Sequence, residues 1–293
     1  MRITSSQLYD NLLSGVNKQL KVQADANASI ASGKRFQTPA QAGIDYKVSL
    51  DLRHTQSQLK GSFEALIVTD SRLGATQSVL TDMIHVLGRA QALAVQQSSA
   101  NMTTAEHQAA ANEVKHLLDQ VANSANKAWE GDALFSGTAI NQQAFVQDAQ
   151  GFYQYQGSAQ DRVVAISNTQ QVVSNVRGDE PAFALMFDAL KTFQNALEND
   201  EGWGIGGAIG DLSKASNGMI DLTSRVGGQI NALSSYRQSY EDMQFAIEKR
   251  LNEHETADIP ALVAEMQQAN IALQASYSQI ANMKNLSLVN FLR

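Results

Sequence analysis

The sequence predicts a mainly α-helical protein with a small β-rich insert: long helices from both chain ends form a bundle or coiled-coil rod, and a central β domain projects. Three observations predict this fold. Apolar residues repeat at helical spacing at both termini, heptads rich in leucine occupy the interior, and Gly, Asn, Gln and Asp increase only between residues 132 and 178. Apolar residues three, four and seven positions apart are typical of amphipathic and packed helices.

The two chain ends carry similar apolar stripes. A lone helix with a narrow stripe is only marginally stable in water, and chain termini usually fray unless they are held by other contacts. A terminal helix pair also offers too few neighbours to bury both stripes fully. We therefore expect burial between subunits, through the self-assembly residues Leu8, Leu12, Val16, Leu20, Leu273, Tyr277, Ile280, Leu288 and Phe291.

Two interior segments repeat apolar residues every seven positions, which is the pattern of helices packed side by side at a shallow angle. The first comprises Leu66, Leu73, Leu80, Leu87 and Ala94, and the second Leu212, Met219, Val226, Leu233, Tyr240 and Ile247. Both are expected to form the core of a bundle within one chain. Gly227 and Gly228 interrupt the second repeat, so we expect a close helix approach there.

Helix boundaries follow from capping residues and prolines. Pro39, Pro181 and Pro260 each stand where a helix can begin. The helix starting at Pro39 is expected to be loosened by Gly43 and Gly61. A capping box at residues 103–106 opens another helix, with the expected buried residues Ala110, Val114, Leu117, Val121 and Ala128.

The central segment has strand character instead. Short β-prone runs occur at residues 143–146, 152–155 and 163–166, and Asp148 to Gly151 is expected to turn a hairpin between the first two. The expected division is therefore terminal assembly arms at residues 1–44 and 255–293, a helical bundle rod at 45–135 and 181–254, and a β-rich outer domain at 136–180.

Composition excludes several partners. The net charge is −7, and no basic patch with interleaved aromatic residues is present, so nucleic acid is not an expected partner. The sequence has no run of about 18 apolar residues, which is the length that a membrane span needs. The residues after Met1 also lack the apolar core of a signal peptide. The chain has no cysteine, which excludes disulfides and Cys-ligated zinc.

The candidate chemical motifs are weak. Gly202, Gly204 and Gly207 have the spacing of a dinucleotide fingerprint, but an amphipathic helix precedes them in place of the required strand, so residues 201–207 are expected to form a loop. His254 to Asp258 resembles a damaged zinc-protease motif, and Pro260 makes one continuous helix improbable there. We expect a solvated helix end, and no catalytic, cofactor or metal residues elsewhere.

Several segments resemble the bacterial flagellins and their hook-associated relatives. The segments lie in family order, at residues 1–6, 31–35, 89–96, 134–138 and 286–292, and read MRITSS, ASGKR, RAQALAVQ, LFSGT and LSLVNFL. Together they span both helical arms. One departure is that Pro39 to Gly43 stand where relatives usually carry two aspartates.

The resemblance implies a structural protein of the flagellum rather than an enzyme. It implies export through the flagellar type III channel without a cleaved signal, with the export apparatus and a cytoplasmic chaperone as partners. Outside the cell, a ring of subunits would lie between the first hook-associated protein and the flagellin filament, and the terminal helices would order on assembly.

Two alternatives remain. The first is the flagellin filament subunit itself, although the Arg2-Ile3-Thr4-Ser5 start and the Asn290-Phe291-Leu292-Arg293 end favour the junction. The second is a secreted enzyme with helical docking arms, which would need a catalytic constellation in the β-rich insert. Residues 132–178 contain no His and no Cys.

Overall fold

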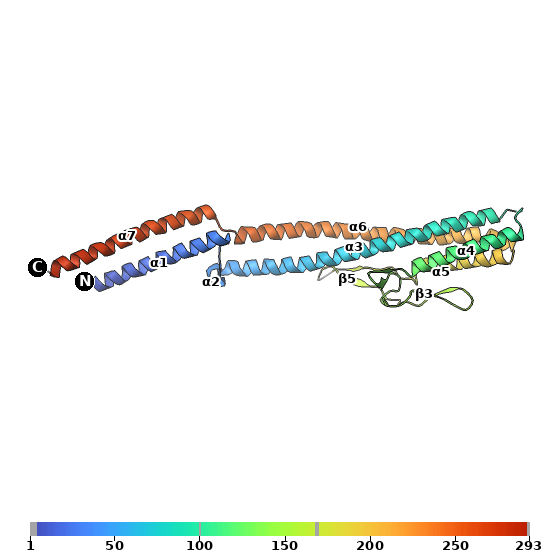
Figure 1. Ribbon diagram of the computed structural model, residues 1–293, viewed down its shortest axis with the longest axis horizontal. Helices are drawn as coiled ribbons and strands as arrows, with labels where there is room; N and C mark the ends of the chain where they lie inside the picture. The colour runs from blue at the N-terminus through green and yellow to red at the C-terminus, as the bar shows by residue number, and fades with distance from the viewer. Residues whose placement is uncertain (1–4, 100, 168–169, 292–293) are drawn as a thin grey trace. The chain divides into compact units, whose positions relative to one another are not determined.

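The computed structural model describes residues 5–99, 101–167 and 170–291, with side chains from residue 7 to residue 282 outside the two gaps. Figure 1 shows the order of the elements along the chain. The helices are α1 (Ser5–Ser32), α2 (Pro39–Ala42), α3 (Ile44–Gln97), α4 (Thr104–Ala125), α5 (Pro181–Glu198), α6 (Gly202–Glu255) and α7 (Ile259–Phe291). The strands are β1 (Ala128–Trp129), β2 (Asp132–Ala133), β3 (Phe145–Gln147), β4 (Tyr153–Tyr155), β5 (Val163–Ala165) and β6 (Gln171–Val173). The predicted class, mainly α with a small β-rich region, is confirmed.

The chain divides into two compact units. Unit 1 comprises residues 1–58 and 242–293, and unit 2 comprises residues 59–241. Unit 1 therefore holds α1, α2, α7, the N-terminal part of α3 up to residue 58 and the C-terminal part of α6 from residue 242. Unit 2 holds α4, α5, all the strands and the rest of α3 and α6.

The core of unit 2 forms where the two predicted heptad repeats pack. Every member of the first repeat, from Leu66 to Ala94, is almost completely buried, as are Leu212, Met219, Val226 and Leu233 of the second. Helices α4 and α5 complete the bundle, because α5 buries its apolar face, including Phe183, Met186, Leu190 and Phe193. The prediction that the interior repeats form a core within one chain is confirmed.

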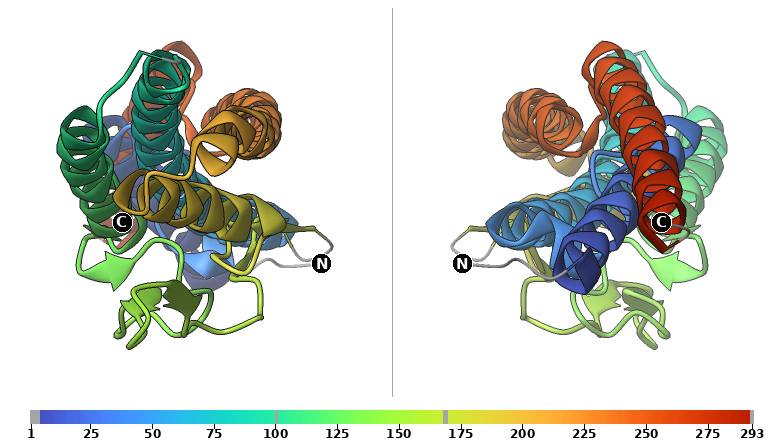
Figure 2. Two further views of the ribbon diagram at one scale, coloured as in Figure 1. Left: turned by 90° about the vertical axis from the view of Figure 1, so that its right-hand side faces the viewer. Right: turned by 90° about the vertical axis from the view of Figure 1, so that its left-hand side faces the viewer.

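The strands form three separate two-stranded antiparallel sheets, β1-β2, β3-β4 and β5-β6. Figure 2 shows them on one side of the helices of unit 2. The predicted hairpin is confirmed: Phe145 pairs with Tyr155, and the Asp148 carboxylate accepts the backbone N–H of Phe152 at 2.8 Å. Phe145 also lies 4.9 Å, centroid to centroid, from Phe187 of α5, so this hairpin packs onto the bundle.

Three local expectations were wrong. Helix α3 runs unbroken from Ile44 through Gly61. Helix α6 is also continuous through Gly227 and Gly228, and a Cβ at Gly227 would lie 3.4 Å from the Gln77 side chain of α3, in keeping with the close helix approach expected there. A break does occur at Gly43, whose φ of 54° lies in the left-handed region. Helix α4 ends at Ala125, so the expected Ala128 lies exposed in β1 instead. In each long helix, burial of an apolar face offsets the roughly 1 kcal/mol that a glycine costs.

The third wrong expectation concerns residues 201–207: Glu201 precedes α6, and residues 202–207 form its first turns rather than a loop. The helix forms there despite its glycines because Ile205 and Ala208 are buried in the core of unit 2, and this burial stabilises the turn. At Gly204 a Cβ atom would come within 3.0 Å of the Ala196 Cβ, so the missing side chain lets α6 approach α5 closely.

Candidate assembly surface

The predicted self-assembly residues lie on two helices that pack against each other. In unit 1, α1 lies alongside α7 (Figure 1), and the Gln23 side chain donates to the Asn270 side-chain oxygen at 3.0 Å. Val16 and Leu273 are buried, and Leu12 and Ile280 are half-buried. These four residues therefore contribute to the pairing of the two terminal helices within one chain.

The other predicted residues remain accessible. Leu8, Leu20 and Tyr277 are each about half exposed, with 46%, 43% and 53% of their surface accessible. Leu288 and Phe291 lie outside the residues whose side chains the structure describes. The single chain thus covers only part of the apolar stripe on each terminal helix.

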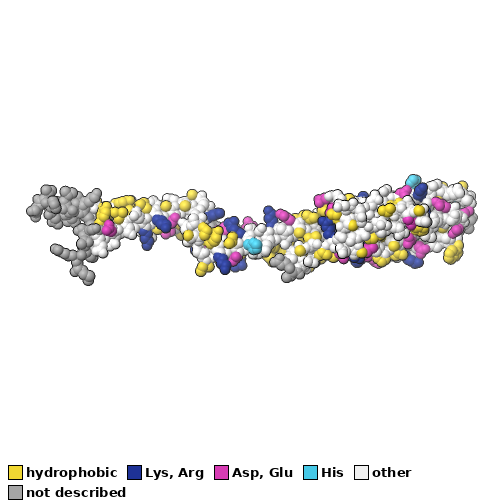
Figure 3. All heavy atoms as spheres, turned by 90° about the horizontal axis from the view of Figure 1, so that it is seen from below, with side chains coloured by type: hydrophobic (Ala, Val, Ile, Leu, Met, Phe, Trp, Pro, Cys, Tyr) yellow, Lys and Arg dark blue, Asp and Glu magenta, His cyan; other side chains and the backbone are white. Residues whose placement is uncertain are grey.

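Unit 1 as a whole has little core. Only seven of the buried hydrophobic residues described belong to it, namely Val16, Ala26, Ile247, Leu251, Ala257, Ala269 and Leu273. Thirteen large hydrophobic residues of unit 1 are exposed: Leu8, Tyr9, Leu13, Leu20, Ile44, Tyr46, Leu50, Met243, Phe245, Ile259, Val263, Ile271 and Tyr277. Figure 3 shows yellow patches of hydrophobic side chains on this part of the molecule. Extended exposed apolar surface of this kind marks an interaction site.

The turns that follow α1 and α6 are joined by backbone hydrogen bonds. The Arg35 N–H donates to the Glu255 carbonyl at 2.7 Å, and the Ala257 N–H donates to the Gly33 carbonyl at 3.0 Å. Lys34 and Thr256 thereby form an isolated antiparallel bridge. This strap joins the turn after the end of α1 to the turn before the start of α7.

A bidentate ion pair reinforces the strap. The Arg53 guanidinium donates to both oxygens of Glu255, at 2.9 and 2.5 Å. These hydrogen bonds hold the pKa of the Glu255 carboxyl below its ordinary value and raise the pKa of Arg53. Arg53 is 54% exposed and Glu255 16%, so solvent screens part of the attraction, and the bidentate geometry distinguishes this pair from an ordinary surface ion pair.

The segment that departs from the family pattern satisfies its own polar groups. The Gln41 side-chain oxygen accepts the backbone N–H groups of Gln37 and Thr38, at 2.9 and 3.2 Å. Its amide then donates to the Asp25 carboxylate of α1 at 3.1 Å. Gln41 therefore caps α2 and ties it to the first helix without an aspartate pair.

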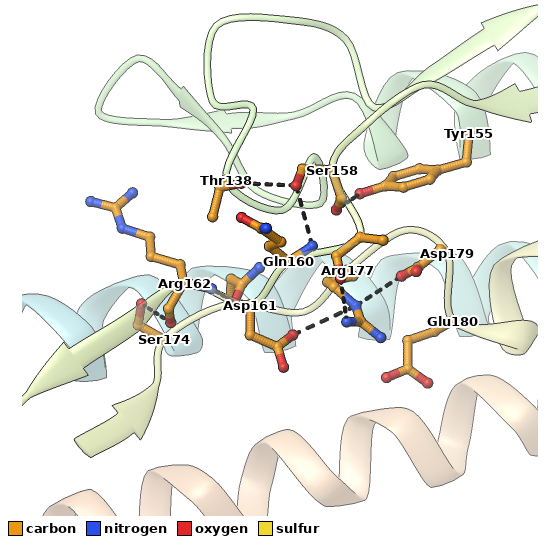
Figure 4. A network of polar contacts seen from close by, with 12 residues as sticks. Thr138, Tyr155, Ser158, Gln160, Asp161, Arg162, Ser174, Arg177, Asp179 and Glu180 are labelled. Carbon is orange, nitrogen blue, oxygen red and sulfur yellow. Dashed lines mark hydrogen bonds and ion pairs between the residues drawn. The ribbon is translucent and has the colours of Figure 1, made fainter. Parts of the chain in front are cut away.

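The β-rich region holds a polar network, drawn in Figure 4. Ser158 receives hydrogen bonds from the Thr138 and Tyr155 hydroxyls, both at 2.8 Å. Nearby, the Arg177 guanidinium lies 2.9 Å from Asp179 and 3.5 Å from Asp161. The carboxylates face a cation and the hydroxyls face one another or the backbone, so the network supports the fold and contains no arrangement of nucleophile and base.

The weak chemical motifs do not assemble into sites. Gly202, Gly204 and Gly207 lie on α6 after another helix, without the strand that a dinucleotide site requires. His254 lies in the last turn of α6 while Asp258 precedes α7, so the two are not on one helix. Over residues 5–99, 101–167 and 170–291, no group of three or more His, Cys, Asp or Glu is placed to hold a metal ion. In the same residues, every helix is too short or too polar to cross a membrane.

Sequence reasoning missed three features of the surface. Trp203 and Phe245 are exposed by 94% and 70%, and neither belongs to a heptad repeat. Their exposure could have been expected, because each lies two residues before a buried position and helix geometry then turns it about 200° away. A groove of about 320 Å³ beside the strap, lined by Phe36, Tyr46 and Leu50 among others, had no sequence signal.

Comparison with known proteins agrees with the resemblance seen in the sequence. Residues 3–140 match the bacterial flagellin N-terminal helical region. The whole chain is 20% identical to the flagellar hook-associated protein 3 of Salmonella typhimurium, covering all of both chains.

Two solved structures share the fold. A putative flagellar hook-associated protein from Vibrio parahaemolyticus superposes with a TM-score of 0.68 at 15% identity, covering 74% of this chain and 100% of that one. The Bacillus cereus protein FlgL superposes with a TM-score of 0.61 at 21% identity, covering 69% of this chain and 99% of that one.

Proposed function

We propose that this chain, which belongs to the family of the bacterial flagellins and their hook-associated relatives, has a structural role in the flagellum. In this role it forms the junction between the hook and the flagellin filament. The alignment with a hook-associated protein 3 over the full length of both chains supports the junction rather than another flagellar position. The function is mechanical, so the protein works by binding its neighbours and not by catalysis.

The observation that carries the proposal is the imbalance within unit 1. Among the described residues, thirteen large hydrophobic side chains are exposed there, against seven buried hydrophobic residues of which three are alanines. At about 25 cal/mol per Å² of apolar surface buried, covering such a surface is a strong drive toward association. A second subunit, or a neighbouring flagellar protein, supplies the missing cover.

The proposal assigns a role to each part. Residues 1–44 and 255–293 are the assembly arms, residues 45–135 and 181–254 are the rod, and residues 136–180 form the outer β-rich domain. The partners are further copies of this chain in a ring, the first hook-associated protein on one side and flagellin on the other. Before assembly, the chain passes the flagellar export apparatus without a cleaved signal, accompanied by a cytoplasmic chaperone.

A flagellin role is the second candidate. It is supported by the match of residues 3–140 to the flagellin N-terminal region, which a filament subunit would share. The two candidates differ in what a cell lacking the gene retains, and this difference gives the experiment.

The deciding experiment deletes the gene in the source bacterium and follows swimming, hooks and secreted flagellin. A non-motile strain that keeps its hooks and releases flagellin monomers into the medium is the result expected for the junction protein. Hooks and junction proteins without any flagellin would identify the filament subunit. Normal swimming would contradict both candidates.

Complementation then tests the assembly residues. Deleting Leu286 to Arg293 is expected to leave unit 2 folded but to abolish filament attachment. Tyr277→Asp places a charge on the exposed stripe of α7 and is expected to impair swimming. Ser278→Asp, which adds the same charge at the neighbouring exposed position, is the matched control. Equal swimming of both variants would remove Tyr277 from the assembly surface.

A further inference from the structure

Trp203 is a large apolar side chain with nothing covering it in the single chain. It lies in the first turn of α6, and 94% of its surface is exposed. The buried neighbours Ile205 and Ala208 fix this turn on the core of unit 2, so the indole is held outward on a rigid element. A tryptophan can bury 150–250 Å² on docking, and it is among the residues most enriched at binding hot spots.

The surroundings of Trp203 are acidic. Glu198, Asp200 and Glu201 are exposed in the turn just before it. The Asp200 carboxylate accepts the Thr104 hydroxyl at 2.6 Å and faces the His107 ring, so this turn is held in place by α4. A partner for Trp203 must therefore offer an apolar recess with positive charge at its edge.

The groove beside the strap of unit 1 has this chemistry. Its volume is about 320 Å³, and its apolar lining is Phe36, Tyr46 and Leu50. Lys34, Arg53 and Glu255 stand on the same lining, and because Arg53 is paired with Glu255, Lys34 supplies the positive charge of the groove. Tyr46 and Leu50 are exposed by 39% and 54%, so the single chain leaves this recess open. Aromatic walls receive an indole well, and a cation close to the indole face adds a cation–π contact.

We propose that Trp203 of one copy docks into the groove at Lys34, Tyr46 and Leu50 of a second copy. The inference rests on the proposed assembly role and names one contact within it. The groove and the indole are different surfaces of one chain, so the contact is heterologous, and repeated heterologous contacts close into a ring when the rotation between copies allows it. Glu201, two residues before Trp203, and Lys34 in the groove set the direction of docking by charge.

Fluorescence can follow the contact directly, because the chain has only two tryptophans. In a full-length Trp129→Phe background, Trp203 is the single indole. Its emission is expected to shift to shorter wavelength as the protein concentration rises, and the shift should follow the appearance of oligomers in sedimentation. Oligomers that form with the emission unchanged would overturn the proposal.

Two substitutions test the two sides of the contact. Trp203→Ala and Leu50→Asp are each expected to weaken self-association at least about tenfold, as hot-spot residues do. Ile220→Ala removes an apolar side chain of α6 that is 45% exposed, close to the 54% of Leu50, and is the control, expected to change the association constant less than about twofold. Unchanged association of folded Trp203→Ala would overturn the proposal.

A charge exchange tests the pairing itself. Lys34→Glu and Glu201→Lys should each weaken association, and the two together should restore it, because the pair is then re-formed with reversed sign. Crosslinking uses the absence of cysteine: a chain carrying Glu201→Cys mixed with one carrying Tyr46→Cys should give a disulfide-linked dimer, whereas Ser278→Cys in place of Tyr46→Cys should not. Equal yields from both mixtures, or additive charge effects, would contradict the docking.

The outcome is separable from that of the proposed function. A Trp203→Ala chain that associates normally and restores swimming to the deletion strain removes this contact and leaves the junction role intact. A deletion strain that swims normally removes the junction role, whatever Trp203 binds.

Discussion

At the scale of single residues, the least expected feature is a buried arginine. Arg72 interrupts the apolar face of α3, and only 2% of its side chain is exposed. It donates to the Ala133 carbonyl at 2.9 Å and lies 3.7 Å from the Asp132 carboxylate, which Arg162 also contacts at 2.7 Å. Burial lowers the pKa of Arg72, since the charged form loses its hydration. The charge fixes β2 against the helix at a definite position.

This arrangement predicts an asymmetric response to mutation. Asp132→Ala should lower the free energy of unfolding by about 2 kcal/mol, because it leaves a buried cation without its counter-charge. Asp221→Ala, at an exposed position of α6, is the control and should change it by less than about 0.5 kcal/mol. Urea denaturation followed by circular dichroism measures both, and equal values would show that Asp132 does not hold Arg72.

A second prediction concerns pH. Arg53 holds the pKa of Glu255 below the ordinary value of 4.5. A carboxyl whose pKa is depressed by folding stabilises the folded state above its ordinary pKa, and this stabilisation is lost as pH falls through the lower, folded value. The strap of unit 1 should therefore loosen on acidification below about pH 4.5.

Hydrogen exchange at the Arg35 and Ala257 amides, measured in steps from pH 6 to pH 3 after correction for the intrinsic rate, reports this loosening. Glu255→Gln should remove most of the dependence. A strap that responds to acid equally in both proteins would assign the effect to another carboxyl.

At the scale of elements, one glycine explains a family motif. Gly137 belongs to the LFSGT segment and has a φ of 67°, which side chains other than glycine rarely adopt. A Cβ there would lie 2.1 Å from the Ser158 carbonyl oxygen, a backbone atom. The turn at Gly137 and the loop between β4 and β5 thus meet only because residue 137 has no side chain.

Gly137→Ala should accordingly destabilise unit 2 by about 3 kcal/mol, from backbone strain and from the clash. Gly88→Ala is the matched substitution in a helix: its Cβ would meet nothing within 4 Å, so we expect a gain of about 0.5–1 kcal/mol. Thermal unfolding compares the two, and opposite signs are the expected result. A neutral Gly137→Ala would mean that the β-rich region rearranges at little cost.

At the scale of the whole molecule, the two units differ in how much stability they generate alone. Unit 2 contains nearly all of the described hydrophobic core, whereas unit 1 consists of helices with one face covered. Local stability follows buried apolar contact, so the units should open separately. Such a division suits a protein whose one part folds alone while the other waits for neighbours.

Hydrogen exchange by mass spectrometry of the isolated chain should show this directly. Amides of α1 and α7 should exchange at least about a hundredfold faster than amides at residues 73–94 of α3, and they should become protected in an assembled ring. Similar protection in both units of the monomer would indicate that unit 1 is stable without partners and would weaken the assembly argument.

Most of the fold was predictable from the sequence by itself because the determining signals are local. Periodicity alone predicts the two heptad repeats, from Leu66 to Ala94 and from Leu212 to Leu233. The conformational range of single residues predicts the hairpin turn at Asp148 and the break at Gly43. The resemblance to flagellar proteins also rested on short segments. All of the self-assembly residues, from Leu8 to Phe291, remain a prediction, because that surface needs a second subunit.

Only the tertiary structure decided the rest, since it depends on contacts between distant residues. Burial against α5 made residues 202–207 helical despite four glycines, and the carbonyl of Ala133 with Asp132 made Arg72 tolerable in a core. The strap between Lys34 and Thr256, and the groove beside it, join segments more than 200 residues apart. No local pattern marks such pairings, because loop closure and packing energy select them only when the whole chain is folded.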